Sequence, residues 1–111
     1  MKTFLIGPVR GKAGDFLEGQ VKTLVANGFS VYWPARDTDQ NDDTGFRICS
    51  DNLGAIKSAD CVHIYWDGQS QGSLFDLGMA FALGKPVHVV HLPECTGGKS
   101  FQAMVKHWES A

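Results

Sequence analysis

The chain has 111 residues, of which 43% are hydrophobic and 20% charged, and its formal net charge is −2. These values are typical of one globular domain with one modest core, so we expect a single domain over residues 1–111. The charge balance excludes a basic face for duplex nucleic acid, and no apolar run reaches the roughly 20 residues that cross a bilayer.

The N-terminus and the cysteines indicate the cellular compartment that we expect for the protein. The apolar stretch in MKTFLIGP is too short for a signal peptide. Cys49, Cys61 and Cys95 are odd in number and widely spaced, which fits reduced thiols better than disulfides. No C-x-x-C or H-x-x-x-H pair indicates zinc. We therefore expect a cytoplasmic protein without a metal or another cofactor.

Runs of apolar and β-branched residues, bounded by turn residues, predict four strands. They are Lys2 to Ile6, Phe29 to Trp33, Cys61 to Trp66 and Pro86 to His91. Apolar residues at helical spacing predict helices over about 15–27, 46–59 and 73–83 and from Ser100 onward. We expect Phe46 and Phe101 on the buried faces of their helices. The acidic stretch ARDTDQNDDTG, residues 35–45, predicts a long loop that is either solvated or a lid.

Strands and helices alternate along the whole chain. This pattern predicts a single-domain α/β fold of the flavodoxin or Rossmann-like kind, with a parallel sheet of order about 2-1-3-4 and helices on both faces. In that order the chain reverses direction between strands 1 and 3, and ligands bind at the carboxyl ends of those strands. The loops that follow them, GPVRGK from Gly7 and DGQSQGS from Asp67, are polar and rich in glycine.

These two loops could form a cradle for a phosphate. Gly7 and Gly11 would allow close approach of the backbone, and Arg10 and Lys12 would supply positive charge. The helix expected to start at Ser73 would add free N–H groups and the positive end of its dipole. The residues alone leave a second interpretation open, in which the cations are surface residues and the glycines only form turns.

Asp76 follows Ser73 by three residues, in the first turn of the expected helix. One interpretation is a capping box, in which Asp76 only pairs with backbone N–H groups. The other is a carboxylate that faces the crevice and meets a ligand. In both cases we expect the helix dipole and the backbone donors to favour the ionised form of the carboxyl.

Several short motifs occur together: Arg10-Gly11, Ala59-Asp60 before the third strand, Ser70, Gly72, and DLGMAFALGKPV from Asp76 to Val87. They resemble the nucleoside 2-deoxyribosyltransferase superfamily, in which the last motif usually reads ELG-x-A-x-ALGKP. The GPVRG loop and Ser70 are more similar to its 2′-deoxynucleoside 5′-monophosphate N-hydrolase branch, in which an S-x-R-G-type loop and a serine hold the 5′-phosphate. The transferases tend to have an aspartate at the position of Ser70.

The resemblance implies a mechanism and a set of site residues. The carboxylate at the position of Asp76, normally a glutamate in the family, attacks C1′ of the sugar as the base leaves, and water or a second base resolves the ester. Asn52 stands where the family has an aspartate that positions this nucleophile and assists the leaving base. Asp67 is a possible substitute acid, or it only forms an Asp-Gly turn. The implied substrate-binding residues are Gly7, Val9, Arg10, Gly11, Asp67, Ser70, Gly72 and Ser73.

We therefore expect an N-glycosidase that hydrolyses a (2′-deoxy)nucleoside 5′-monophosphate. Two alternatives stay open: a nucleoside 2-deoxyribosyltransferase that exchanges bases, and a non-catalytic nucleotide-binding module. The expected partner is a nucleoside 5′-monophosphate or a nucleoside, and neither duplex nucleic acid nor a membrane. Because related proteins complete their pockets with a neighbouring subunit, the resemblance also implies a homodimer or a higher homo-oligomer.

Overall fold

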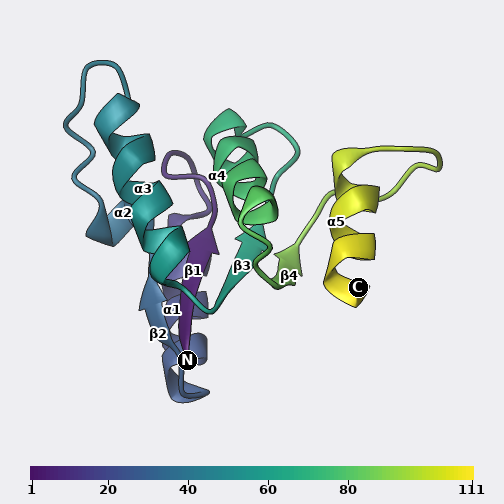
Figure 1. Ribbon diagram of the computed structural model, residues 1–111, viewed down its shortest axis with the longest axis horizontal. Helices are drawn as coiled ribbons and strands as arrows, with labels where there is room; N and C mark the ends of the chain where they lie inside the picture. Colours follow the sequence, from purple (N-terminus) through teal and green to yellow (C-terminus); the bar gives the residue numbers. More distant parts are fainter.

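A parallel four-stranded sheet forms the centre of the protein (Figure 1). The computed structural model describes residues 1–111, and its strands lie in the order β2-β1-β3-β4. The elements in chain order are β1 (Lys2–Ile6), α1 (Gly14–Ala26), β2 (Ser30–Tyr32), α2 (Pro34–Asp37), α3 (Phe46–Ser58), β3 (Cys61–Tyr65), α4 (Gln71–Ala82), β4 (Val87–His91) and α5 (Phe101–Ser110). The predicted α/β class and strand order are thus confirmed.

The two central strands are mostly apolar, as expected for a parallel sheet that is covered on both faces. In β1 the side chains of Phe4, Leu5 and Ile6 are fully buried, and in β3 those of Val62 and Ile64 are as well. Successive side chains of a strand point to opposite faces, so this continuous apolar run supplies core residues to both sides of the sheet.

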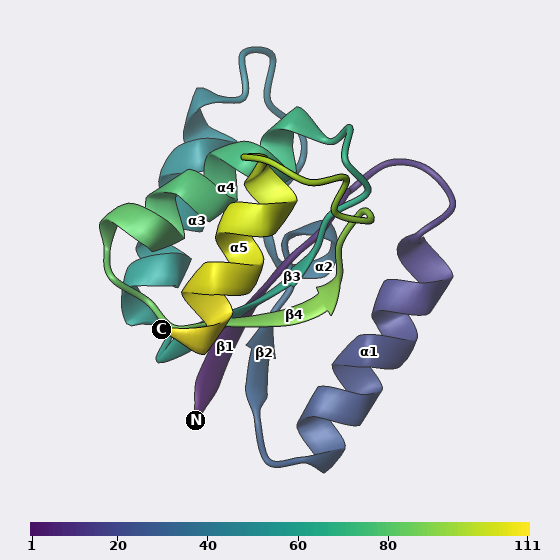
Figure 2. The same cartoon turned by 90° about the vertical axis from the view of Figure 1, so that its right-hand side faces the viewer.

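The helices are divided unequally between the two faces (Figure 2). α1 lies alone on one side, where Leu17 and Val21 pack against Leu5. α3, α4 and α5 lie together on the other side and bury the larger cluster, to which α4 contributes Leu77 and α5 contributes Val105. The prediction of helices on both faces is confirmed, and the crowded face supplies α3 and α4 to the candidate site.

The predicted acidic loop is wrong in its first part. Residues Pro34–Asp37 form the short helix α2, whose first residue is a proline. Proline suits this position because its fixed φ is helical and its missing N–H would have had no partner there. The Asp37 carboxylate accepts a hydrogen bond from the Trp33 N–H at 2.9 Å, which stabilises the turn.

Two residues predicted to be buried, Phe46 and Phe101, are exposed, with 79% and 56% of their surfaces accessible. Each is the first residue of its helix, and the buried residues of α3 and α5 come later in the chain. The start of α3 lies beyond the ends of the strands (Figure 1), so its first turn has no sheet beneath it to cover Phe46.

The structure also describes the three cysteines and the length of the helices. Cys49 is half-buried, Cys61 buried and Cys95 exposed, and all three are free thiols. Among α1 to α5, no helix combines the length and the apolar character that crossing a bilayer requires.

Candidate active site

A cleft of about 510 Å³ opens at the carboxyl ends of β1 and β3, where the two glycine-rich loops meet α3 and α4. The structure brings all of the predicted site residues to this cleft except Gly11. Those in its lining are Gly7, Val9, Arg10, Asn52, Asp67, Ser70, Gly72, Ser73 and Asp76. The lining residues that the sequence did not predict are Pro8, Gln40, Ile48, Cys49, Gln69 and Gln71.

A second hollow, of about 430 Å³, lies beside β2 and α3, toward the start of β1. Its walls include small residues of α3 such as Gly54 and Ser58. Its one carboxylate, that of Asp51, already forms an ion pair with Arg47 at 2.8 Å. The first cleft, in contrast, combines a buried carboxylate with an unpaired cation, so we assign the chemistry to it.

The start of α4 differs from the prediction. Its N-cap is Ser70, three residues before the predicted cap at Ser73. The Ser70 Oγ atom accepts hydrogen bonds from the N–H and the hydroxyl of Ser73, at 3.3 and 3.0 Å. Asp76 is therefore the sixth helical residue and lies outside the first turn. The capping-box interpretation of Ser73 and Asp76 is wrong.

Both backbone groups of Ser70 are fixed by neighbouring side chains. Its N–H donates to Asp67 Oδ1 at 2.8 Å, and its carbonyl accepts a hydrogen bond from Trp66 Nε1 at 3.2 Å. The Ser70 N–H, together with the Gln69 N–H at 2.8 Å, lowers the pKa of Asp67. Asp67 is thus an ionised turn residue, which favours the turn interpretation over a substitute acid.

Asp76 lies at the floor of the cleft, with 7% of its surface exposed. Burial raises the pKa of its carboxyl to about 6, and hydrogen bonding from Asn52 opposes this rise. The Asn52 Nδ2 atom lies 3.4 and 3.5 Å from the two carboxylate oxygens. The expectation that the helix start would favour the ionised form is wrong, because burial dominates. A carboxyl with this pKa is still mostly ionised at pH 7.

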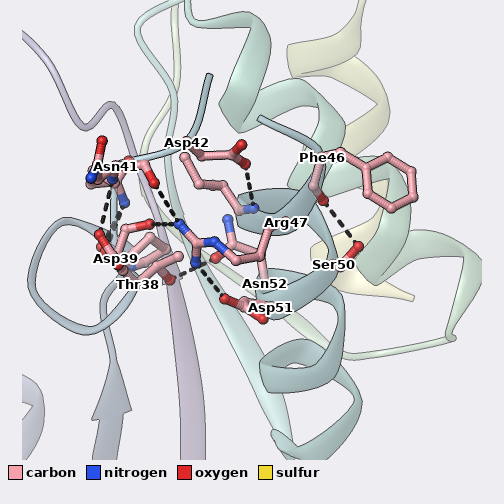
Figure 3. Close-up of polar contacts among 12 residues, drawn as sticks. Thr38, Asp39, Asn41, Asp42, Phe46, Arg47, Ser50, Asp51 and Asn52 are labelled. Carbon is pink, nitrogen blue, oxygen red and sulfur yellow. Dashed lines mark hydrogen bonds and ion pairs between the residues drawn. The ribbon is translucent and has the colours of Figure 1, made fainter. Parts of the chain in front are cut away.

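Asn52 is itself 5% exposed and lies on the inner side of α3. Its carbonyl oxygen accepts a hydrogen bond from Thr38 Oγ1 at 2.8 Å, and Thr38 Oγ1 is 2.6 Å from the Tyr32 hydroxyl. Figure 3 shows Thr38 reaching Asn52 from the segment that precedes α3. The motif spacing located Asn52, but Thr38 stands in an acidic stretch without periodicity and gave no signal.

Residues 7–10, in the loop after β1, form one side of the rim of the cleft. At position 7 a Cβ would lie 2.8 Å from Leu17 Cδ1, so a larger residue there would have to displace this buried side chain. Arg10 is exposed and lines the cleft, and the two ion pairs of the chain are formed by other arginines, Arg36 and Arg47. Its guanidinium is therefore available to an anion. Lys12 lies outside the lining, so the second predicted cation does not contribute there.

Three of the unpredicted lining residues come from α3 and the segment before it: Gln40, Ile48 and Cys49. The Gln40 side chain donates to the carbonyls of Pro34 and Thr38, at 3.0 and 3.1 Å, which fixes it at the edge of the cleft. Burial, and then the negative charge of Asp76, raise the pKa of the Cys49 thiol. Cys49 therefore stays protonated at neutral pH beside the buried carboxylate.

The profile of the nucleoside 2-deoxyribosyltransferase family matches residues 4–100. The match covers both glycine-rich loops, α3, and α4 with its carboxylate. The chain belongs to the nucleoside 2-deoxyribosyltransferase family. A search among curated protein sequences finds no significant match.

Two solved structures share the fold. One is a 2-deoxyribosyltransferase from Bacillus psychrosaccharolyticus, with a TM-score of 0.70 and 21% sequence identity, over 96% of this chain and 81% of that one. The other is the CMP N-glycosidase BcmB of Clostridium botulinum, with a TM-score of 0.69 and 16% identity, over 99% of this chain and 82% of that one. At these identities the likeness concerns the fold alone.

Proposed function

We propose that this protein is an N-glycosidase that hydrolyses the bond between the base and the sugar of a (2′-deoxy)nucleoside 5′-monophosphate. The observation that carries the proposal is the position of Asp76, a buried carboxylate at the floor of a cleft whose rim bears Arg10 and the N-terminus of α4. The membership of the family, and the similarity of the fold to a CMP N-glycosidase, support this class of substrate.

The rim offers several donors for a 5′-phosphate. The N-terminus of α4 presents backbone N–H groups at Gln71 and Gly72 together with the positive end of the helix dipole. Ser70 Oγ already accepts two hydrogen bonds from Ser73, which leaves the Ser70 hydroxyl hydrogen free to donate to a phosphate oxygen. Arg10 supplies a charge-assisted bond from the opposite loop. Together these groups would anchor the substrate with its C1′ above the floor.

The proposed reaction has two steps. An oxygen of the ionised Asp76 attacks C1′, a C–O bond forms, and the glycosidic C–N bond breaks with its electron pair going to the base, which takes a proton from water. A water molecule then attacks C1′, the C–O bond to Asp76 breaks to regenerate the carboxylate, and the proton that this water loses neutralises the hydroxide left by the first step. Asn52 orients Asp76 through its amide nitrogen, and an amide cannot itself transfer a proton at neutral pH.

A second candidate function is base exchange between nucleosides. The family profile and the similarity to a 2-deoxyribosyltransferase favour it. In this alternative a second base, rather than water, would attack the sugar ester at Asp76. Ser70 favours the hydrolysis of a monophosphate over base exchange, because its hydroxyl offers a hydrogen-bond donor to a phosphate at the N-terminus of α4.

A substrate panel separates these functions. The protein is incubated with nucleoside 5′-monophosphates and with nucleosides, with and without an acceptor base, and free base is followed by chromatography. We expect base release from monophosphates without an acceptor. Exchange that occurs only on nucleosides with an acceptor would establish the transferase, and binding without turnover would establish the non-catalytic module.

We further propose that the protein works as a homodimer or a higher homo-oligomer. Phenylalanines at more than half exposure lie on three neighbouring helices, Phe46 on α3, Phe75 and Phe81 on α4, and Phe101 on α5. Exposed aromatic side chains on adjacent helices would be covered from water by a second copy of the chain. Sedimentation velocity should give a mass at least twice the 12.1 kDa of the chain, and a monomer at micromolar concentration would contradict this.

A further inference from the structure

The segment of residues 38–42, which we call the strap, passes beside the floor of the cleft and is fixed at both ends. At one end Thr38 is 5% exposed and bonds Asn52. At the other end the Asp42 carboxylate accepts the Ile48 N–H of α3 at 3.1 Å. Asp42 thereby satisfies a free donor in the first turn of α3, which ties the strap to this helix.

Between these ends, Arg47 of α3 holds the backbone of the strap (Figure 3). Its guanidinium donates to the carbonyls of Asp39 and Asn41, the latter at 3.3 Å, and to Asp51 at 2.8 Å. The Asp39 carboxylate accepts the Asn41 N–H at 3.0 Å. The strap is therefore attached to α3, with the Asp39 carboxylate bonded inside the strap and the Asp42 carboxylate bonded to the first turn of α3.

The direction of the hydrogen bonds at Thr38 follows from the charge on Asp76. An ionised carboxylate only accepts, so the Asn52 amide turns its nitrogen toward Asp76 and its oxygen away. That oxygen needs a donor, and the Thr38 hydroxyl supplies it at 2.8 Å. Because this hydroxyl has one hydrogen, the Tyr32 hydroxyl must donate to Thr38. An amide whose oxygen accepts a hydrogen bond is also a stronger donor at its nitrogen.

We propose that Thr38, held in place by the strap, is a positioning residue that keeps the nitrogen of Asn52 facing Asp76 and so aims the carboxylate at the substrate. Thr38 does not line the cleft, so it acts through Asn52 without touching the substrate. The catalytic consequence rests on the proposed function, whereas the orientation of Asn52 is a property of the free protein.

Few ionisable groups surround Asp76 in the cleft. They are Cys49 of α3, Arg10 of the loop after β1 and Asp67 of the turn before α4. No acidic side chain of the strap lines the cleft. A substitution at Thr38 therefore changes no charge near Asp76, and a change in the titration of Asp76 reports on the hydrogen bond from Asn52.

The test compares Thr38→Val, which keeps the shape of the side chain without its hydroxyl, with Thr38→Ser, which keeps the hydroxyl. The Asp76 carboxyl is titrated in the free protein by ¹³C NMR, and kcat and KM are measured as a function of pH. We expect Thr38→Val to raise the midpoint of the Asp76 titration by about 0.5 pH units. We also expect it to lower kcat about tenfold with little change in KM, because the carboxylate is less well aimed. Thr38→Ser should restore both values.

Two further variants keep the test decisive. Thr23→Val is a matched control, since the Thr23 hydroxyl bonds the Gly19 carbonyl within α1, away from the cleft. Arg47→Ala loosens the strap without touching a buried side chain, and we expect a smaller rise in the Asp76 midpoint. An Asp76 titration that is unchanged in both Thr38→Val and Arg47→Ala would overturn the inference, as would Thr38→Ser behaving like Thr38→Val. If Thr38→Val does not fold, the Asp76 titration of Arg47→Ala alone decides whether the inference holds.

The NMR readout needs no turnover, so it separates this inference from the proposed function. If no nucleotide is hydrolysed but the Asp76 midpoint moves as expected, the orientation of Asn52 stands and the glycosidase fails. If nucleotides are hydrolysed and the midpoint does not move in either variant, the glycosidase stands and the role of Thr38 fails.

Discussion

The floor and the rim of the cleft are built in opposite ways. At the floor, Asp76 and Asn52 are at most 7% exposed and are hydrogen-bonded to each other, and Thr38 behind them bonds Asn52. At the rim, Arg10 is exposed and forms no side-chain hydrogen bond or ion pair within the chain, and Val9 is 47% exposed. The floor is thus fixed in the free protein, whereas the guanidinium of Arg10 at the rim is left without a partner. Changes at the floor should therefore affect the chemistry, and changes at the rim should affect binding.

The largest expected effect is at the floor. Asp76→Asn keeps the size of the side chain and removes the nucleophile, so we expect kcat/KM for monophosphate hydrolysis to fall by at least about 1,000-fold. Binding of the nucleotide, measured by calorimetry, should stay within about threefold of the wild type because the rim is intact. A variant that keeps a tenth of the activity would show that another group attacks the sugar.

The same substitution should stabilise the protein at neutral pH. The folded pKa of Asp76, about 6, lies above the ordinary value of 3.8, so the buried charge costs stability above pH 6 and this cost disappears as the pH falls to 4. The shift corresponds to roughly 3 kcal/mol in the free energy of unfolding. Urea unfolding should show Asp76→Asn more stable than wild type by up to that amount at pH 7, with the difference gone near pH 4.

The stability of the wild type alone would not isolate Asp76, because His63 also changes its charge between pH 7 and pH 4. The test therefore compares the free energies of unfolding of the wild type and Asp76→Asn. Burial, and then the charge of His88, lower the pKa of His63 to about 4, so the free energy of unfolding decreases as the pH falls from the ordinary histidine pKa of 6.5 toward 4. This contribution is present in both proteins and cancels in the difference. An equal stability difference at pH 7 and pH 4 would contradict the raised pKa of Asp76.

At the rim we expect a smaller effect of a different kind. Arg10→Ala should raise KM for a nucleoside 5′-monophosphate by about 10- to 100-fold, because a charge-assisted hydrogen bond to the phosphate is lost. The kcat value should change little, and any activity on nucleosides, which lack the phosphate, should be unaffected. Lys12→Ala is the matched control, since Lys12 does not line the cleft. Equal losses on nucleosides and monophosphates would contradict the phosphate role of Arg10.

The contrast between floor and rim is also reflected in what the sequence could predict. The rim residues lie in the loops that follow strands 1 and 3. The alternation of strands and helices was sufficient to predict that these two loops meet. Asn52 and Asp76 were located by their motifs. The hydrogen bond from Thr38 to Asn52 depends on how α3 packs against the strap, and no periodic pattern in the sequence predicts this packing.

The errors had physical causes as well. Ser70 and Ser73 are both good N-cap residues, and the choice between them depended on Trp66 and Asp67 holding the backbone of Ser70. Moving the cap to Ser70 placed Asp76 outside the first turn, so burial rather than the helix dipole sets its pKa. Burial of a polar residue is a result of tertiary packing and could not be read from its neighbours in the sequence.

The smallest expected effect is the pH dependence of the wild-type protein near neutrality. Because Asp76 must be ionised to attack, kcat/KM should fall below a pH of about 6, by tenfold for each further pH unit, and should change less than twofold between pH 7 and 8. The measurement is the initial rate of base release from pH 4.5 to 8. An acid limb centred near pH 4 would show that Asp76 is as solvated as an ordinary carboxyl.

The central claim is that the side chain at position 76 becomes bonded to the sugar. A nucleoside 5′-monophosphate with fluorine at C2′ slows the release of the sugar from a carboxylate ester, so the ester should accumulate. Intact-mass and peptide mass spectrometry after incubation should then show one sugar phosphate added, on the peptide that contains Asp76, and none in Asp76→Asn. Release of base with no adduct, or an adduct on another residue, would contradict the account.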